Sequence, residues 1–118
     1  MFEMIFFATD AGRQPVKEFL DALDVKMRNK VLDNLKHLQI HGHHLREPYS
    51  KPLGDGIFEL RTRLGSDITR VLYFFFVGKK IVLTHGFVKM TQKIPPQEIE
   101  RAKEYRAMYH KREENSNG

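Results

Sequence analysis

The chain has 118 residues, of which 41% are hydrophobic and 30% are charged, and its formal net charge is +5. This length and composition fit one globular domain with a modest core, and the absence of cysteine excludes disulfide bonds and thiolate chemistry. Because no apolar run is long enough to span a bilayer and the start of the chain lacks the basic region of a signal peptide, we expect a cytoplasmic protein without a membrane partner.

The N-terminal third predicts one strand followed by two amphipathic helices. The apolar run Phe2–Ala8 is typical of a short strand. Pro15 suits the first turn of a helix, because its missing N–H costs nothing there. Asp24 is a good N-cap for a second helix and Gly42 a good stop. Apolar residues recur at helical spacing in both helices: Val16, Phe19, Leu20 and Leu23, then Met27, Val31, Leu35 and Leu38. We expect this helical hairpin to cover one face of a sheet.

Three histidines, His41, His43 and His44, follow the second helix and invite a metal interpretation. A closed ligand set is not evident, because the chain has no cysteine and Glu47 is the only acid nearby. Imidazolium groups are also favourable at a helix C-terminus without a metal. We therefore expect neither a metal nor another cofactor. The next segment, Leu45–Gly56, contains several prolines and glycines and is predicted to be an irregular connection.

The middle of the chain predicts three consecutive strands rich in β-branched and aromatic residues, at Ile57–Leu64, Ile68–Val77 and Ile81–Val88. Turns at residues 65–67 and 78–80 join them. These connections are too short for parallel crossovers, so we expect the strands to pair antiparallel.

A last helix is predicted to begin near Pro96, with Ile99 and Ala102 on its apolar side. The fold class is therefore α+β, with a small antiparallel sheet, an N-terminal helical hairpin on one face and a C-terminal helix. We expect a single domain over residues 1–110, and we expect the polar residues 111–118 to be disordered.

The positive charge is concentrated in the predicted sheet. Eight Lys or Arg and only three Asp or Glu lie between residues 51 and 93, so this stretch carries the whole net charge of +5. A basic surface on a small rigid sheet is typical of a protein that binds a polyanion.

Alternation along the strands assigns the charged side chains to faces. Glu59, Arg61 and Arg63 share one face of their strand, which is costly unless that face is open or lined by anionic partners. Arg61, Arg70, Lys89 and Lys93 are expected near one end of the sheet. We predict a cleft here, on the face that the hairpin leaves uncovered. Alternation in the third strand groups His85 with Ile81, Leu83 and Phe87, which predicts that His85 is buried with them.

Three motifs in this order carry a family resemblance: G-I-F-E-L-R (56–61), T-R-V-L-Y-F-F (69–75) and H-G-F-V-K-M-T-Q-K-I-P (85–95), followed by Glu98, Ile99 and Ala102. The series resembles the phage-derived HigB branch of the RelE/ParE toxin superfamily, over nearly the whole chain. The resemblance implies a type II toxin that cleaves messenger RNA (mRNA) on the ribosome. It also implies a helix-turn-helix antitoxin (HigA-like) as partner, which brings operator DNA into contact with the complex.

The chemistry of such an endoribonuclease can be argued from residue types. Without a metal, the 2′-OH of the RNA attacks the adjacent phosphate, and the site must take its proton and stabilise the phosphorane. Arginine suits the phosphorane because its guanidinium fork matches phosphate geometry. A lysine crowded by other cations can have a lowered pKa and transfer the proton, which makes Lys89 and Lys93 candidates and His85 the alternative.

By resemblance, Arg61 matches the arginine of the E-L-R motif, and Arg70 matches a catalytic arginine of RelE-like enzymes. Lys89, Gln92 and Lys93 match a basic loop. The chain departs from the family pattern in two places: Met90 replaces a second basic residue of that loop, and no tyrosine stands immediately after Lys93. We predict Arg61, Arg70, Lys89 and Lys93 as catalytic residues, and Lys51, Arg63, Tyr73, His85 and Gln92 as RNA contacts.

Two other functions remain open at this point. The first is a non-enzymatic poison on the same fold, like the ParE toxins that target DNA gyrase, because fold does not decide function. The second is a plain RNA-binding module. Each arginine also has a purely structural interpretation, as a solvated charge or as an ion-pair partner of Glu59 or Asp67.

Overall fold

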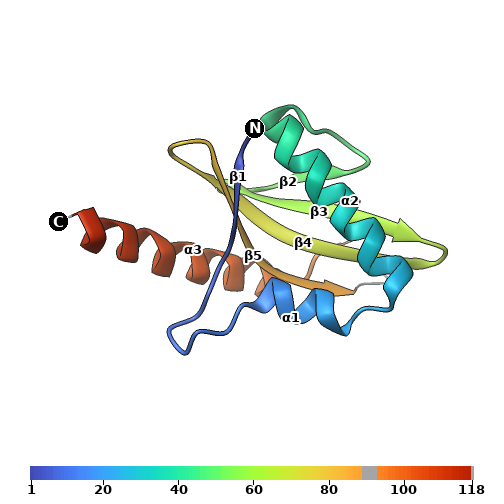
Figure 1. The fold of residues 1–118 in the computed structure, drawn as a ribbon, viewed down its shortest axis with the longest axis horizontal. Coiled ribbons are helices and arrows are strands. Elements are labelled where there is room, and N and C mark those ends of the chain that lie inside the picture. The colour runs from blue at the N-terminus through green and yellow to red at the C-terminus, as the bar shows by residue number, and fades with distance from the viewer. Residues whose placement is uncertain (89–92, 118) are drawn as a thin grey trace.

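The computed structural model of the protein describes residues 1–88 and 93–117. Its elements, in chain order, are β1 (Glu3–Phe6), α1 (Pro15–Ala22), α2 (Val25–His41), the short 3₁₀ helix η1 (Gly42–His44), β2 (Ser50–Gly54), β3 (Ile57–Leu64), β4 (Asp67–Phe76), β5 (Lys80–Val88) and α3 (Pro96–Asn117). The five strands form one sheet in the order β1-β5-β4-β3-β2 (Figure 1). Only β1 pairs in parallel, with β5. The structure thus confirms the predicted α+β class.

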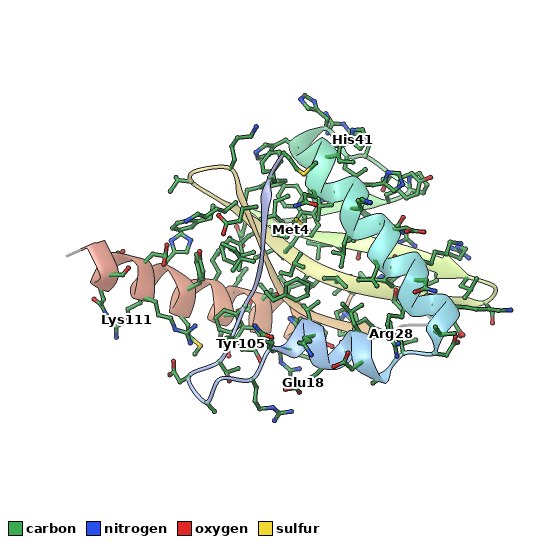
Figure 2. All side chains as sticks on the ribbon, in the orientation of Figure 1. Met4, Glu18, Arg28, His41, Tyr105 and Lys111 are labelled. Carbon is green, nitrogen blue, oxygen red and sulfur yellow. The ribbon has the colours of Figure 1, made fainter. Side chains whose placement is uncertain are left out.

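The helices cover both faces of the sheet, as the packed side chains in Figure 2 show. Leu60, Val71 and Tyr73 point to one face and pack against apolar residues of α1 and α2. Alternate residues of the same strands, including Leu72 and Phe74, point to the other face and pack with Ala102 and its neighbours on α3. The alternation of side chains along each strand therefore separates two clusters, one under the hairpin and one under α3.

The helix ends follow from the residues expected there. Pro15 is the first residue of α1. The Asp24 side chain accepts a hydrogen bond from the Lys26 backbone N–H at 2.8 Å and caps α2. Gly42 ends α2 with φ +51° and ψ −120°, a backbone conformation that residues with a Cβ rarely adopt. These three signals are confirmed.

Gly42 also lies where no side chain fits, which gives a testable prediction. A Cβ at this position would be 2.0 Å from Cε1 of the Phe2 ring. Gly42→Ala is therefore expected to lower the free energy of unfolding by more than the roughly 1–3 kcal/mol that the backbone strain alone costs. Gly12→Ala is the matched control, because Gly12 has φ +85° but nothing within 4 Å of the added Cβ. Equal losses for the two variants in urea unfolding would contradict the Phe2 clash.

Two segments differ from the expectation. The connection predicted to be irregular contains β2, which pairs antiparallel with β3 at the end of the sheet. Pro52 is tolerated in β2 because an edge strand can do without one backbone donor. At the other end of the chain, residues expected to be disordered continue α3 through Asn117. Arg112 holds this end, because its guanidinium donates to the Ala8 carbonyl and to the Asp10 carboxylate, both in the N-terminal segment.

The register of β5 also differs. Leu72 of β4 pairs with His85, but the next residue, Tyr73, pairs with Leu83, so β5 carries one extra residue at Thr84. Such a bulge turns the following side chains to the other face of the sheet. The predicted grouping of His85 with Ile81 and Leu83 is therefore wrong, and His85 lies on the face covered by α3.

Candidate functional site

The charged residues of the sheet meet in two rows on the face covered by α3. In the first row, strand pairing aligns Lys51 of β2, Glu59 of β3, Leu72 of β4 and His85 of β5. In the next row, Arg61 of β3 is aligned with Arg70 of β4 and Phe87 of β5. Cross-strand neighbours on one face lie about 4.5–5.5 Å apart at Cβ. The structure thus brings Arg61 and Arg70 together as direct cross-strand neighbours.

A single buried carboxylate, that of Glu59, joins the two arginines. Its Oε1 lies 3.5 Å from Arg61 Nε and its Oε2 lies 3.3 Å from Arg70 Nε. The Glu59 side chain is 2% exposed and that of Arg70 0%, whereas that of Arg61 is 19% exposed. Two guanidinium groups against one carboxylate leave a local charge of +1 that is partly open to solvent through Arg61, which suits a phosphate.

Burial and ion pairing shift the pKa values of Glu59 and Arg70 in opposite directions. Burial raises the pKa of Glu59, and the charges of Arg70, Arg61 and Lys51 oppose this rise. Burial also lowers the pKa of Arg70, which the Glu59 carboxylate opposes. An arginine stays protonated even so. The Glu59–Arg70 pair is therefore a desolvated ion pair, and each partner depends on the other.

A shallow pocket of about 220 Å³ lies beside these rows. Lys51 and Lys93 line it together with Glu59, and Leu53, Ile94 and Ile99 complete it. Two predicted site residues therefore lie next to the carboxylate that binds the arginines. We expected this face to be an open cleft, but α3 covers much of it and leaves this pocket near its N-terminal end. The predicted residues Lys89 and Gln92 lie outside the described residues.

His85 is held under the first turn of α3. Its Nδ1 lies 3.2 Å from Thr84 Oγ1, and its Nε2 lies 3.4 Å from the Glu98 carboxylate. Burial lowers the pKa of His85, with Arg101 acting in the same direction and Glu98 opposing it. His85 is therefore neutral at pH 7 and retains one nitrogen that can accept a proton.

The lowered pKa of His85 predicts how stability depends on pH. The unfolded chain takes up a proton at His85 near pH 6.5, whereas the folded protein takes it up only at lower pH. The contribution of His85 to the free energy of unfolding is thus complete above pH 6.5 and is lost as pH falls below it. In His85→Gln this dependence should be absent. Urea unfolding at pH 7.5 and pH 5.5 measures the difference, and equal pH dependence in both proteins would contradict the assignment.

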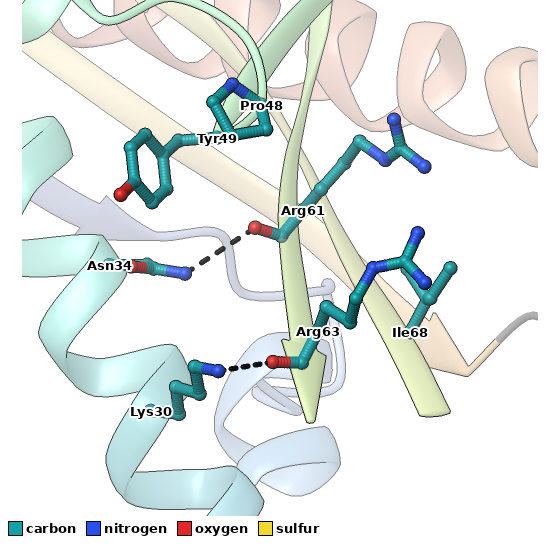
Figure 3. A pocket seen from close by; sticks show the side chains of 7 residues that line it. All are labelled: Lys30, Asn34, Pro48, Tyr49, Arg61, Arg63 and Ile68. Atoms are coloured by element: carbon teal, nitrogen blue, oxygen red, sulfur yellow. Dashed lines mark hydrogen bonds between the residues drawn. The ribbon is translucent and has the colours of Figure 1, made fainter. Parts of the chain in front are cut away.

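Arg63 lies two residues beyond Arg61 on the same strand and is exposed. A pocket of about 220 Å³ at this edge of β3 is lined by Lys30, Asn34, Pro48, Tyr49, Arg61, Arg63 and Ile68 (Figure 3). From α2, the Asn34 amide donates to the Arg61 carbonyl and the Lys30 ammonium donates to the Arg63 carbonyl. The figure shows the Arg61 and Arg63 side chains leaving β3 on the side away from α2. The backbone edge is thus held by α2 while the guanidinium groups point away from it.

Tyr73, a predicted RNA contact, lies elsewhere. Its ring is 1% exposed, packs in the cluster under α1 and α2, and stacks on Phe58 at 5.5 Å between centroids. Its hydroxyl forms a 2.5 Å hydrogen bond with Ser50 Oγ, and burial raises its pKa to about 12. The structure does not bring Tyr73 together with the arginines, because the two lie on opposite faces of the sheet.

The three histidines considered for metal binding also separate. His43 stacks on Phe75 with 3.7 Å between ring centroids, and His41 lies parallel to His37 on α2. Within residues 1–88 and 93–117, no three His, Asp or Glu side chains lie close enough together to hold a metal ion.

Sequence reasoning missed the roles of two acids. Glu59 was considered only as one of two possible ion-pair partners, yet it contacts both arginines. The signal was its place on the same strand face as Arg61, two residues away. Glu98 enters the sequence analysis only as a motif residue, but its carboxylate lies 3.4 Å from His85 Nε2, between α3 and β5. No local signal could have shown this contact, because it depends on the bulge in β5.

The family model described as Phage derived protein Gp49-like (DUF891) matches residues 18–107, about three quarters of the chain. No curated protein gives a significant match. Of the helices in the described ranges, none combines the length and apolar character needed to cross a membrane. The matched segment contains both rows of the site, from Lys51 to Phe87. The chain therefore belongs to the Gp49-like family of phage-derived proteins, a toxin-like family of the RelE/HigB type.

Proposed function

We propose that the chain is the toxin of a type II toxin–antitoxin system and acts as an endoribonuclease on mRNA in the ribosome. Its membership of a toxin-like family supports the first part. The observation that carries the second is the pair Arg61–Arg70, placed on neighbouring strands and bound to one carboxylate. A structural ion pair needs only one arginine per carboxylate, whereas a transferring phosphate benefits from two.

In the proposed mechanism a general base takes the proton of the 2′-OH, whose oxygen attacks the adjacent phosphorus. The bond to the 5′-oxygen breaks as this leaving oxygen takes up a proton, and a 2′,3′-cyclic phosphate forms. Arg61 binds the phosphate oxygens. Arg70, whose position Glu59 fixes, lies beside Arg61 on the neighbouring strand and adds its positive charge. Both guanidinium groups stabilise the charge that develops on the phosphorane, which is where fixed cations contribute most. Lys51, Lys93 and Arg63 bind the flanking backbone.

Proton transfer has two candidates among the described residues. Lys93 is exposed beside the Glu59 pocket, and His85 is buried but neutral and held between Thr84 and Glu98. The pH profile of the cleavage rate and two variants separate them. If His85 is the base, the rate falls only below pH 6.5, because its pKa is lowered from that value. If Lys93 is the base, Lys93→Met should abolish cleavage and His85→Gln should leave it. The resemblance adds Lys89, which lies outside the described residues.

The proposed partner is a helix-turn-helix antitoxin of the HigA type, encoded next to this chain, which would also bring the complex to operator DNA. We place the toxin in the cytoplasm, where its proposed substrate is. An antitoxin that occupies the site would present carboxylates to Arg61 and Lys51. Reversing one of these charges, as in Lys51→Glu, would then weaken pairing, whereas an antitoxin bound on α1 and α2 would bind this variant as tightly as the wild type.

The test is cleavage in a reconstituted translating extract, with the RNA ends mapped by primer extension. Three results support the proposal. New mRNA ends should depend on ribosomes and carry a 2′,3′-cyclic phosphate. They should also form with toxin that has been stripped of metal ions by EDTA before it is added to the extract. Growth arrest without mRNA cleavage, together with inhibition of gyrase supercoiling, would instead support the ParE-like alternative. Expression without growth arrest would support a plain RNA-binding module.

A further inference from the structure

A second feature lies beside the arginines, across the edge of β3. Three exposed rings, Tyr49, His37 and His41, follow one another in nearly parallel planes, and we call them the ring ladder. The Tyr49 and His37 centroids are 6.3 Å apart with 25° between the planes, and those of His37 and His41 are 6.2 Å apart with 11°. Tyr49 is 47% exposed. Exposed parallel rings offer their faces for stacking, which no role described above uses.

The ring ladder is joined directly to the proposed site. The Arg61 backbone N–H donates to the Tyr49 carbonyl at 2.7 Å, so the two residues are neighbours across the strand edge. Tyr49 also shares its pocket with Lys30, Arg61 and Arg63, and none of the seven residues that line this pocket is acidic. Figure 3 places Tyr49 and Lys30 on the α2 side of β3, with both arginine side chains on the other side. An RNA strand that crosses this edge would therefore meet Lys30 and the Tyr49 ring on one side of β3 and the two guanidinium groups on the other.

We propose that the ring ladder is a stacking platform for the bases of single-stranded RNA, with Tyr49 stacking on a base of the same strand whose phosphate Arg61 binds. This inference rests on the proposed function, because it assumes that Arg61 binds an RNA phosphate. The chemistry favours single-stranded RNA: base stacking on aromatic rings beside a cationic groove tolerates any sequence, and unpaired bases present their faces. Tyr49 is here a binding residue that orients the substrate.

The test is direct binding of a short single-stranded RNA with one 2-aminopurine, measured by fluorescence and anisotropy on the full chain. Tyr49→Ala should weaken binding about tenfold and remove the quenching of 2-aminopurine that stacking causes. Tyr49→Phe, the matched control, keeps the ring and should bind within about twofold of the wild type. The slope of log Kd against log salt should not change in Tyr49→Ala, whereas Arg63→Ala should lower it by about 1. The reason is that an RNA phosphate releases counterions when an arginine neutralises it, and a stacked tyrosine neutralises no phosphate.

Several results would overturn the platform. They are wild-type affinity in Tyr49→Ala, equal weakening in Tyr49→Phe, or no measurable binding of the wild type to single-stranded RNA at low salt. Unchanged circular dichroism and urea midpoints show that each variant is folded. The outcome is separable from the proposed function. Stacking on Tyr49 without mRNA cleavage in the extract removes the nuclease and keeps the platform, whereas cleavage with unaltered binding in Tyr49→Ala removes only the platform.

Discussion

Arg61→Ala is expected to lower the rate of mRNA cleavage about 100- to 1,000-fold, the usual cost of removing one fixed donor to a developing oxyanion. Arg61 is the partly exposed member of the pair, so its side chain can reach a phosphate. The fold should survive, because Glu59 keeps Arg70, and we expect a loss of only about 1–2 kcal/mol in the free energy of unfolding. Arg61→Ala combined with Arg70→Ala should abolish cleavage.

Two controls make this result specific. Arg63→Ala removes an exposed arginine from the same strand face, two residues away, and should change cleavage by only a few fold through weaker RNA binding. Arg61→Lys keeps the charge but not the fork, and should recover only part of the activity. Cleavage at the wild-type rate in folded Arg61→Ala would remove Arg61 from the mechanism, and growth arrest that persists in the double variant would favour a gyrase poison.

Arg70→Ala is expected to lower the free energy of unfolding by about 3–5 kcal/mol, because it leaves the Glu59 carboxylate in a buried site without its buried partner. The deficit should be largest at neutral pH. Burial already raises the pKa of Glu59, and loss of Arg70 raises it further, so the folded variant binds a proton that the unfolded chain releases. Its stability therefore falls as pH increases above about 4.3, the ordinary value, and recovers toward acid.

The double variant Glu59→Gln with Arg70→Met is the matched control. It removes both charges and keeps most of the volume, so it should lose much less stability than Arg70→Ala. Urea unfolding of both single variants and the double gives the coupling between the two side chains. Equal losses in Arg70→Ala and in the double variant would show that the cost comes from the lost volume of Arg70 and not from a Glu59 carboxylate that has lost its buried partner.

Most of the fold could be predicted from local patterns. β3 has the predicted bounds, Ile57–Leu64, and β4 and β5 differ by one residue at their ends. The β-branched and aromatic runs of these strands, separated by turns that contain glycine, predict each strand from a few neighbouring residues. Alternation also groups Glu59 with Arg61 within β3, whereas the placement of Arg70 beside Arg61 depends on the register of β3 and β4. β2 was missed because Pro52 and Gly54 dominate its local pattern, and only its pairing with β3 makes it a strand.

The rest of the site depends on contacts between distant parts of the chain. A single extra residue at Thr84 reverses the face of His85. The one local hint is Gly86 within the same strand, but a glycine there is equally explained by the close approach of the Phe19 ring. The end of α3 is polar throughout, and its order rests on the bonds from Arg112 to residues about a hundred positions earlier. The choice of Glu59 over Asp67 as the shared acid likewise needed the register of β3 and β4.

The Glu59 carboxylate that the two arginines share predicts which amino-acid changes would inactivate the protein without unfolding it. Glu59 and Arg70 are locked in the interior, so losing either one alone damages folding and exposes the product to proteases. Arg61 is the one member that can be replaced at little structural cost. Under the proposed function, a codon change at position 61 would therefore inactivate the toxin and leave a folded product, whereas a change at Glu59 or Arg70 would inactivate it by removing the product. Variants inactivated at position 61 should therefore still accumulate as folded protein, whereas single variants at Glu59 or Arg70 should not.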